Sequence, residues 1–143
     1  MVVIYTRSAM LEDLAQKCME TFPDLAHLDN PDCRIAYQLS NQEKESRNRI
    51  VYADVEKVKD KIKAFMHYDF LVTFYEPNCE KLDEEHLMRL MYHELKHIGF
   101  DPADDKFWMI PHDVEDFSVM IERWGLDWIY STQDALQDVS QSS

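Results

Sequence analysis

The chain has 143 residues and a formal net charge of −13, with 45% hydrophobic and 12% aromatic residues. This length predicts one domain with a sizeable core, and the acidic charge argues against broad contact with a phosphate backbone, which needs clustered lysine and arginine. No apolar run approaches membrane-spanning length, and the short apolar start followed by Arg7 does not fit a signal peptide. We therefore expect a cytoplasmic protein that binds neither nucleic acid nor membrane.

The first predicted element is a helix from about Ser8 to Phe22. Ser8 is a candidate N-cap, apolar residues recur at helical spacing, and Pro23 ends the pattern. Residues 24–32 predict a loop that contains the turn sequence Asn30-Pro31-Asp32. His27 in this loop has no partner at metal-ligand spacing, so we expect it to be a surface histidine.

Three short runs, 34–39, 49–55 and 69–75, are rich in the β-branched and aromatic residues of strands. The polar segment 40–48 is suited to a hairpin connection between the first two runs. The spacing of apolar residues in 57–66 indicates a short helix. The sequence therefore predicts a three-stranded, largely antiparallel sheet in an α+β fold.

The three cysteines, Cys18, Cys33 and Cys79, are widely spaced and form no C-x-x-C pair. Neither a disulfide framework nor a cysteine zinc site is indicated, because both depend on paired or clustered cysteines. We expect three buried free thiols.

The segment from His93 to His97 matches the pattern H-E-x-x-H within a predicted helix that begins near Asp83 and stops at Gly99. On a helix, His93 and His97 lie one turn apart on the same face, so both imidazoles can bind one metal ion. Glu94 lies beside that ion and can accept a proton from water that the ion activates. This is the arrangement that a metal-dependent hydrolase needs.

The remainder of the chain is less regular. Residues 100–111 show no clear period, whereas 113–124 predict a helix that stops at Gly125. Residues 131–143 form a polar tail without a core-forming pattern, and we expect disorder there. Residues 1–130 are therefore predicted to form a single domain.

A catalytic zinc usually has three protein ligands and an open position for water. His112, fifteen residues after His97, is the favoured third ligand, because imidazole suits zinc and because Asp113 and Asp116 lie close enough in sequence to hold its second nitrogen. Glu115 is the alternative, and it can replace or supplement His112.

Four blocks of the sequence resemble a known family when they are taken together. They are Asp69-Phe70-Leu71-Val72, Leu82-Asp83-Glu84-Glu85, Tyr92-His93-Glu94-Leu95-Lys96-His97-Ile98-Gly99 and His112-Asp113-Val114-Glu115-Asp116-Phe117. This succession is similar to metallopeptidases encoded by phages and prophages, which are small zincin-like proteins with the general layout of SprT-like metallopeptidases. The resemblance extends over about residues 35–117.

The resemblance implies a zincin-like α+β fold, in which a small, mostly antiparallel sheet packs against an active-site helix and flanking helices. It also implies that His112 is the third ligand and that the protein acts in the cytoplasm of a bacterial host. By the same resemblance, strand 69–75 is expected at the edge of the cleft, where it can pair with an extended substrate. Tyr92, Tyr130 and His86 are weaker candidates for stabilising an oxyanion.

The sequence thus predicts a zinc-dependent metallopeptidase that acts on a peptide or protein substrate. His93, His97 and His112 hold Zn²⁺ in this prediction, and Glu94 is the general base. The alternative is a non-catalytic zinc-binding phage protein that docks to a host protein. Glu94 argues against this alternative, because a purely structural zinc site has no need of a base. The sequence leaves the substrate and the oligomeric state open.

Overall fold

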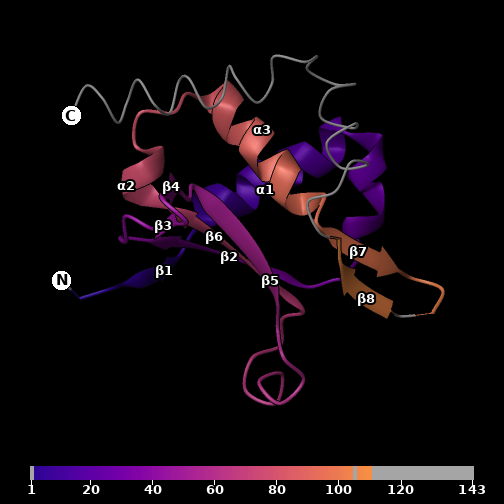
Figure 1. Cartoon of the computed structure of the whole chain (residues 1–143). Helices are drawn as coiled ribbons and strands as arrows, with labels where there is room; N and C mark the ends of the chain where they lie inside the picture. The colour runs from indigo at the N-terminus through magenta and orange to yellow at the C-terminus, as the bar shows by residue number, and fades with distance from the viewer. Residues whose placement is uncertain (1, 105, 111–143) are drawn as a thin grey trace.

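The structure is a computed structural model that describes residues 2–104 and 106–110 (Figure 1). The helices are α1 (Ala9–Thr21), the 3-10 helix η1 (Pro23–Leu28), α2 (Glu76–Cys79) and α3 (Glu84–Leu95). The strands are β1 (Tyr5–Arg7), β2 (Ile35–Ser40), β3 (Glu45–Ser46), β4 (Arg49–Ile50), β5 (Ala53–Lys57), β6 (Phe70–Tyr75), β7 (Ile98–Asp101) and β8 (Lys106–Met109).

A four-stranded sheet in the order β1-β2-β6-β5 forms the centre of the molecule. The β1–β2 and β5–β6 pairs are antiparallel, whereas β2 and β6 run parallel, with Ile35 opposite Phe70 and Tyr37 opposite Val72. The predicted α+β class and the small, mostly antiparallel sheet are therefore confirmed. The sheet has one more strand than predicted, because the exposed β1 is too short to carry an alternating hydrophobic pattern.

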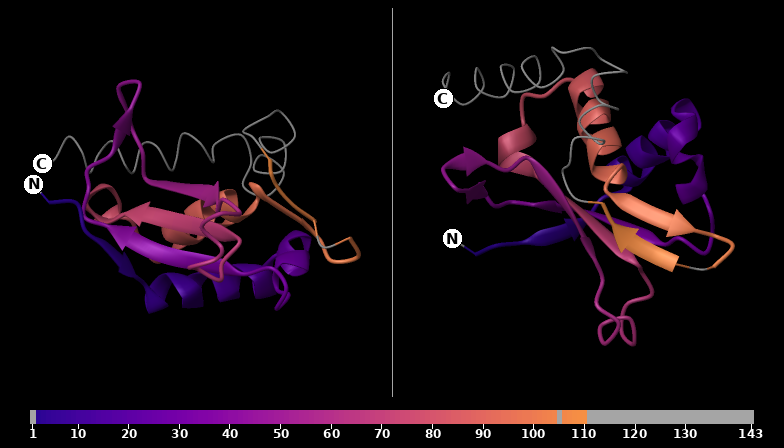
Figure 2. Two further views of the ribbon diagram at one scale, coloured as in Figure 1. Left: turned by 90° about the horizontal axis from the view of Figure 1, so that it is seen from below. Right: turned by 45° about the vertical axis from the view of Figure 1, so that its right-hand side comes forward.

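Helices α1 and α3 pack against each other and against one face of the sheet (Figures 1 and 2). Alternate residues of β2, β6 and β5 share this face, because side chains along a strand point to opposite sides in turn. The core combines Leu11 and Cys18 of α1, Val72 and Phe74 of β6, and Leu95 of α3. This packing fixes α3, which carries most of the H-E-x-x-H segment, against the sheet.

The predicted first helix and turn are present. Ser8 caps α1, with its hydroxyl accepting a hydrogen bond from the Leu11 amide at 3.1 Å. The predicted loop that follows contains η1, and the Cys33 amide donates to the Asn30 carbonyl at 2.9 Å in the expected turn. Cys18, Cys33 and Cys79 are buried free thiols, as predicted.

Two connections differ from the prediction. Segment 40–48 does not join paired strands, because β6 lies between β2 and β5 in the sheet, and β3 and β4 form a separate small hairpin instead. The predicted helix at 57–66 is also wrong: β5 extends to Lys57, and a series of turns follows. Phe65 in these turns is 89% exposed, so the apolar spacing there does not mark a buried helical face.

The chain after α3 forms a β-hairpin that the sequence did not reveal. Helix α3 ends at Leu95, and Gly99 lies inside β7 opposite Trp108 of β8, so Gly99 is not the helix stop. A Cβ atom on Gly99 would lie 2.1 Å from Cε2 of the Trp108 indole. Glycine is therefore needed here for the close approach of the ring, and the hairpin brings the chain back to the end of α3 (Figure 2).

Gly99→Ala is expected to lower the free energy of unfolding by about 1–3 kcal/mol, because the new methyl group displaces the Trp108 ring. Urea unfolding followed by circular dichroism measures the change. In a Trp108→Ala background the same substitution should cost much less. An equal cost in both backgrounds would show that the indole does not impose the glycine.

The described part of the chain contains no helix that combines the length and the hydrophobicity needed to cross a bilayer. The helix predicted at 113–124, the tail at 131–143 and the end of the predicted domain lie outside the described residues.

Candidate metal centre

Helix α3 positions the first two residues of the candidate site. Its N-terminus is capped by Asp83, whose carboxylate accepts a hydrogen bond from the His86 amide at 2.8 Å. Met91 and Leu95 of this helix are fully buried in the core. His93 and Glu94 therefore lie on a helical segment that is fixed by packing in the core.

His97 lies just beyond the regular helix. The C-cap of α3 is Lys96, and the His97 amide donates to the Glu94 carbonyl at 3.1 Å, three residues back. The main chain of Ile110, which follows β8, provides two further bonds: its amide donates to the His97 carbonyl at 2.6 Å, and its carbonyl oxygen lies 2.5 Å from His97 Nδ1. The hairpin thus holds both the backbone and the ring of His97.

The two imidazoles of His93 and His97 face each other with their Nε2 atoms 3.3 Å apart. The ring centroids are separated by 4.9 Å, and the ring planes are nearly perpendicular, at 86°. Two nitrogen ligands at ordinary zinc distances and a tetrahedral angle are also about 3.3 Å apart. The pair therefore fits two ligand positions of a tetrahedral zinc ion.

The hydrogen-bond geometry of His97 favours the tautomer that a ligand requires. With the Ile110 carbonyl at Nδ1, that nitrogen carries the proton and donates it, which leaves the lone pair of Nε2 directed at His93. A carbonyl behind a histidine ring is a common support for metal ligands, since it fixes both the tautomer and the orientation of the ring.

Glu94 is buried, with 5% of its surface exposed, although it carries a carboxylate. It lies near the thiol of Cys79, whose pKa is raised to about 12, mainly by burial and in addition by the charge of Glu94. The Cys79 thiol also donates to the Tyr52 carbonyl, with the sulfur 3.2 Å from the oxygen. Because its pKa is high, this thiol remains protonated at neutral pH and does not compete for a metal as a thiolate.

The other predicted site residues are not all placed by the structure. His112 and Glu115, with Asp113, Asp116 and Tyr130, lie outside the described residues. Within residues 2–104 and 106–110, no three His, Cys, Asp or Glu side chains gather in a way that could hold a metal ion. The described part of the site therefore supplies two candidate ligands and one carboxylate.

The weaker oxyanion candidates on α3 have other contacts. His86 Nδ1 lies 2.5 Å from Asp83 Oδ1 in the capping turn, about 10 Å of helix rise before His93. Tyr92 is fully buried, and its hydroxyl donates to the carboxylate of Asp24 in η1. His27 is exposed on η1, as predicted for a surface histidine.

The expectation that strand 69–75 lies at the edge of the cleft is wrong. All six residues of β6 pair with β2 on one side, and the first five pair with β5 on the other. Its main-chain groups are therefore used inside the sheet. Among the described strands, β5 ends the sheet on this side, and β5 also contacts α3.

Sequence reasoning missed Ile110, whose main chain is hydrogen-bonded to His97. Ile110 acts through its main chain, so its residue type carries no signal for this role. A recognised β7–β8 pairing would have indicated Ile110, because the register that sets Ile98 opposite Met109 brings the next residue, Ile110, beside His97.

Comparison with known proteins identifies a family for the chain. A family model described as "Putative phage metallopeptidase" matches residues 3–140. No curated protein and no solved structure matches the chain significantly. Since the matched region covers almost the whole sequence, which contains the H-E-x-x-H helix, the chain belongs to this family of phage metallopeptidases.

Proposed function

We propose that the protein is a zinc-dependent peptidase in which His93 and His97 bind the metal ion and Glu94 is the general base. The observation that carries this proposal is the convergence of the two Nε2 atoms, 3.3 Å apart, together with the burial of Glu94, the residue that follows His93. Membership of a metallopeptidase family implies a metal cofactor and a peptide or protein substrate. Zinc is the metal that this donor set favours for hydrolysis at neutral pH.

Bound zinc would supply an activated water molecule and polarise the substrate carbonyl. Glu94 accepts a proton from the attacking water and returns it to the leaving nitrogen of the cleaved bond. Its burial and its place next to His93 in the sequence suit this role, because a carboxylate with little competing solvent exchanges a proton efficiently with a nearby group. The ring of His97 stays oriented through its bond to Ile110.

The third ligand in this proposal is His112. Ile110 is hydrogen-bonded to His97 through both its amide and its carbonyl, and His112 follows Ile110 by two residues. Two residues of chain span at most about 7 Å, so the short separation in sequence permits His112 to reach a metal ion held by the histidine pair. Asp113 and Asp116 are proposed to orient this ligand, and Glu115 is the alternative ligand on the same segment.

His112→Ala is expected to reduce the zinc bound per chain well below one equivalent after dialysis against buffer that contains no metal, since two ligands hold the ion more weakly than three. Atomic emission spectroscopy of the dialysed protein measures the zinc content. Glu115→Ala is the matched variant and should retain zinc. The reverse pattern would assign the third ligand to Glu115.

The strand that offers main-chain groups to an extended substrate is proposed to be β5. It ends the described sheet next to α3, where a peptide could add as a further strand. Substrate pairing at this position would place the peptide beside α3, which carries His93. We thus propose β5 as the substrate-binding strand in place of β6, which lies inside the sheet.

Removal and return of the metal test the proposed function. Cleavage of fluorescein-labelled casein should be abolished by 1,10-phenanthroline and restored by one equivalent of zinc after the chelator is dialysed away. Cleavage that persists without metal would contradict the proposal. Protein that binds zinc but cleaves neither casein nor a random peptide library would favour the non-catalytic docking protein instead.

A further inference from the structure

Asp24 joins the 3-10 helix η1 to the last turn of α3. Its Oδ2 atom accepts a hydrogen bond from the Tyr92 hydroxyl and lies 3.4 Å from Nζ of Lys96. The Tyr92 ring is fully buried and packs edge-on against Phe22, the residue before η1, with the ring centroids 4.7 Å apart. The side chain of Asp24 is only 31% exposed, so solvent screens these contacts less than it screens a pair on the open surface.

The two partners of Asp24 have a fixed relation to the candidate ligands. Tyr92 directly precedes His93, and Lys96 directly precedes His97. Residues four apart lie on one side of a helix, so a single carboxylate oxygen contacts both turns that carry the histidines. Any rotation or unwinding of the last turn of α3 would separate Lys96 or Tyr92 from Asp24.

This part of the helix needs external support. His97 lies beyond the C-cap and its amide makes a bond three residues back, and helix ends of this kind fray readily. Ile110 holds His97 from the hairpin side, whereas Asp24 holds the turn from the side of η1. A metal site tolerates displacements of only about 0.5 Å in its ligands, so both supports bear on the distance between the two Nε2 atoms.

We propose that Asp24 is a positioning residue for the metal centre. Its carboxylate clamps the last turn of α3 through Tyr92 and Lys96 and thereby holds His97 at ligand distance from His93. Asp24 also offsets the positive charge that Lys96 brings beside a site for a dication. The inference rests on the proposed zinc site, and its experiments are chosen to separate a failure of the clamp from a failure of that site.

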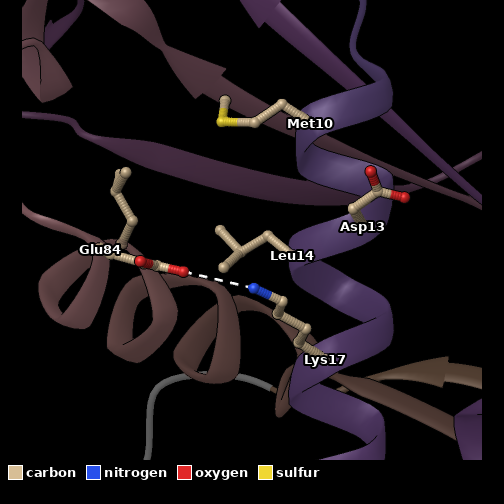
Figure 3. A pocket seen from close by; sticks show the side chains of 6 residues that line it. Met10, Asp13, Leu14, Lys17 and Glu84 are labelled. Carbon is tan, nitrogen blue, oxygen red and sulfur yellow. Dashed lines mark hydrogen bonds and ion pairs between the residues drawn. The ribbon is translucent and has the colours of Figure 1, made fainter.

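The first test compares Asp24→Asn with Glu84→Gln. Glu84 is the matched control, because its carboxylate also lies 3.4 Å from a lysine, Lys17 of α1, and joins an upstream element to the opposite end of α3 (Figure 3). Zinc affinity is measured by competition with a chromophoric chelator. Asp24→Asn should weaken zinc binding about tenfold, the lower end of what supporting residues contribute, and Glu84→Gln should leave it unchanged. Equal affinities in both variants would overturn the proposal.

A double-mutant cycle distinguishes positioning from a general loss of stability. In a Tyr92→Phe/Lys96→Met background the clamp is already absent, so adding Asp24→Asn should cause no further loss of zinc affinity. A further loss of the same size as in the parent would show that Asp24 acts elsewhere. Melting curves of the zinc-free variants confirm that each protein is folded at the temperature of the titration.

Amide hydrogen exchange on the zinc-free protein tests the clamp without the metal. Asp24→Asn should speed exchange at the amides of Lys96 and His97, whereas Glu84→Gln should not. Unchanged exchange in Asp24→Asn would overturn the inference. If the parent protein binds no zinc, the proposed function fails, and this exchange measurement still decides whether Asp24 holds the end of α3.

Discussion

Glu94→Gln is expected to retain bound zinc and to lose peptide hydrolysis by about 10²–10⁴-fold. Glutamine keeps the size and the hydrogen-bonding capacity of the side chain but cannot accept the proton of the attacking water, and general base catalysis contributes about this factor. Glu94 is not one of the two imidazole ligands, so the metal content should stay at the parental value. Zinc content and cleavage of a peptide library are measured on the same preparation.

The control for this variant is Glu85→Gln on the same helix. Glu85 is exposed and paired with Arg89 at 2.6 Å in the first turns of α3, away from the histidine pair. This variant should retain both zinc and hydrolysis. Hydrolysis that is unchanged in Glu94→Gln would remove Glu94 from the chemistry. A parent protein with zinc and no hydrolysis of any peptide would point to the non-catalytic role.

His97→Ala is expected to weaken zinc binding by more than about 100-fold, beyond the effect of losing a supporting residue, because a direct ligand is removed. The same result is expected for His93→Ala, since each histidine contributes one of the two facing Nε2 atoms. The measurement is zinc affinity by chelator competition, accompanied by a far-ultraviolet spectrum of each zinc-free variant.

His86→Ala serves as the control for the histidine variants. His86 is on the same helix but contacts Asp83 in the capping turn, so zinc affinity should stay within about twofold of the parental value, a difference of less than about 0.5 kcal/mol. A comparable loss of zinc in all three variants would show that the affinity follows helix stability and not ligation. Parental affinity in His97→Ala would remove this residue from the site.

Helices α1 and α3 were predictable because they combine hydrophobic periodicity with local capping. Ser8 and Asp83 accept hydrogen bonds from amides three residues later, so a short stretch of sequence indicates where each helix begins. The pattern in β6 is equally local, since almost every residue of this buried strand is apolar. Elements of this kind are fixed by interactions that a short sequence window contains.

Strand order and the hairpin after α3 depend on longer-range pairing. The parallel alignment of β2 with β6 joins residues 35 apart in sequence, and nothing in either strand alone excludes the simpler β2–β5 hairpin. Gly99 was predicted as a helix stop because glycine commonly ends helices, but tertiary packing of Trp108 places it inside a strand. The position of β6 inside the sheet likewise depends on its pairing with both β2 and β5, which the sequence of β6 alone does not indicate.

The part of the candidate site that was predictable from the sequence lies on or next to one helix, α3. The four-residue spacing of His93 and His97 places both rings on one side of α3, and the structure brings their Nε2 atoms together. The supports of the site come from distant segments: the Ile110 main chain on the hairpin and the Asp24 carboxylate on η1. These contacts depend on the packed fold, so no local sequence pattern could reveal them.

An anomalous difference map would show directly whether His93 and His97 are ligands of one zinc ion. Crystals of the purified protein, with its zinc content measured first, would be recorded on both sides of the zinc absorption edge. We expect one zinc per chain, with a single peak about 2.0–2.1 Å from the Nε2 atoms of both histidines. A peak elsewhere, or a protein that takes up no zinc at pH 7, would contradict this expectation.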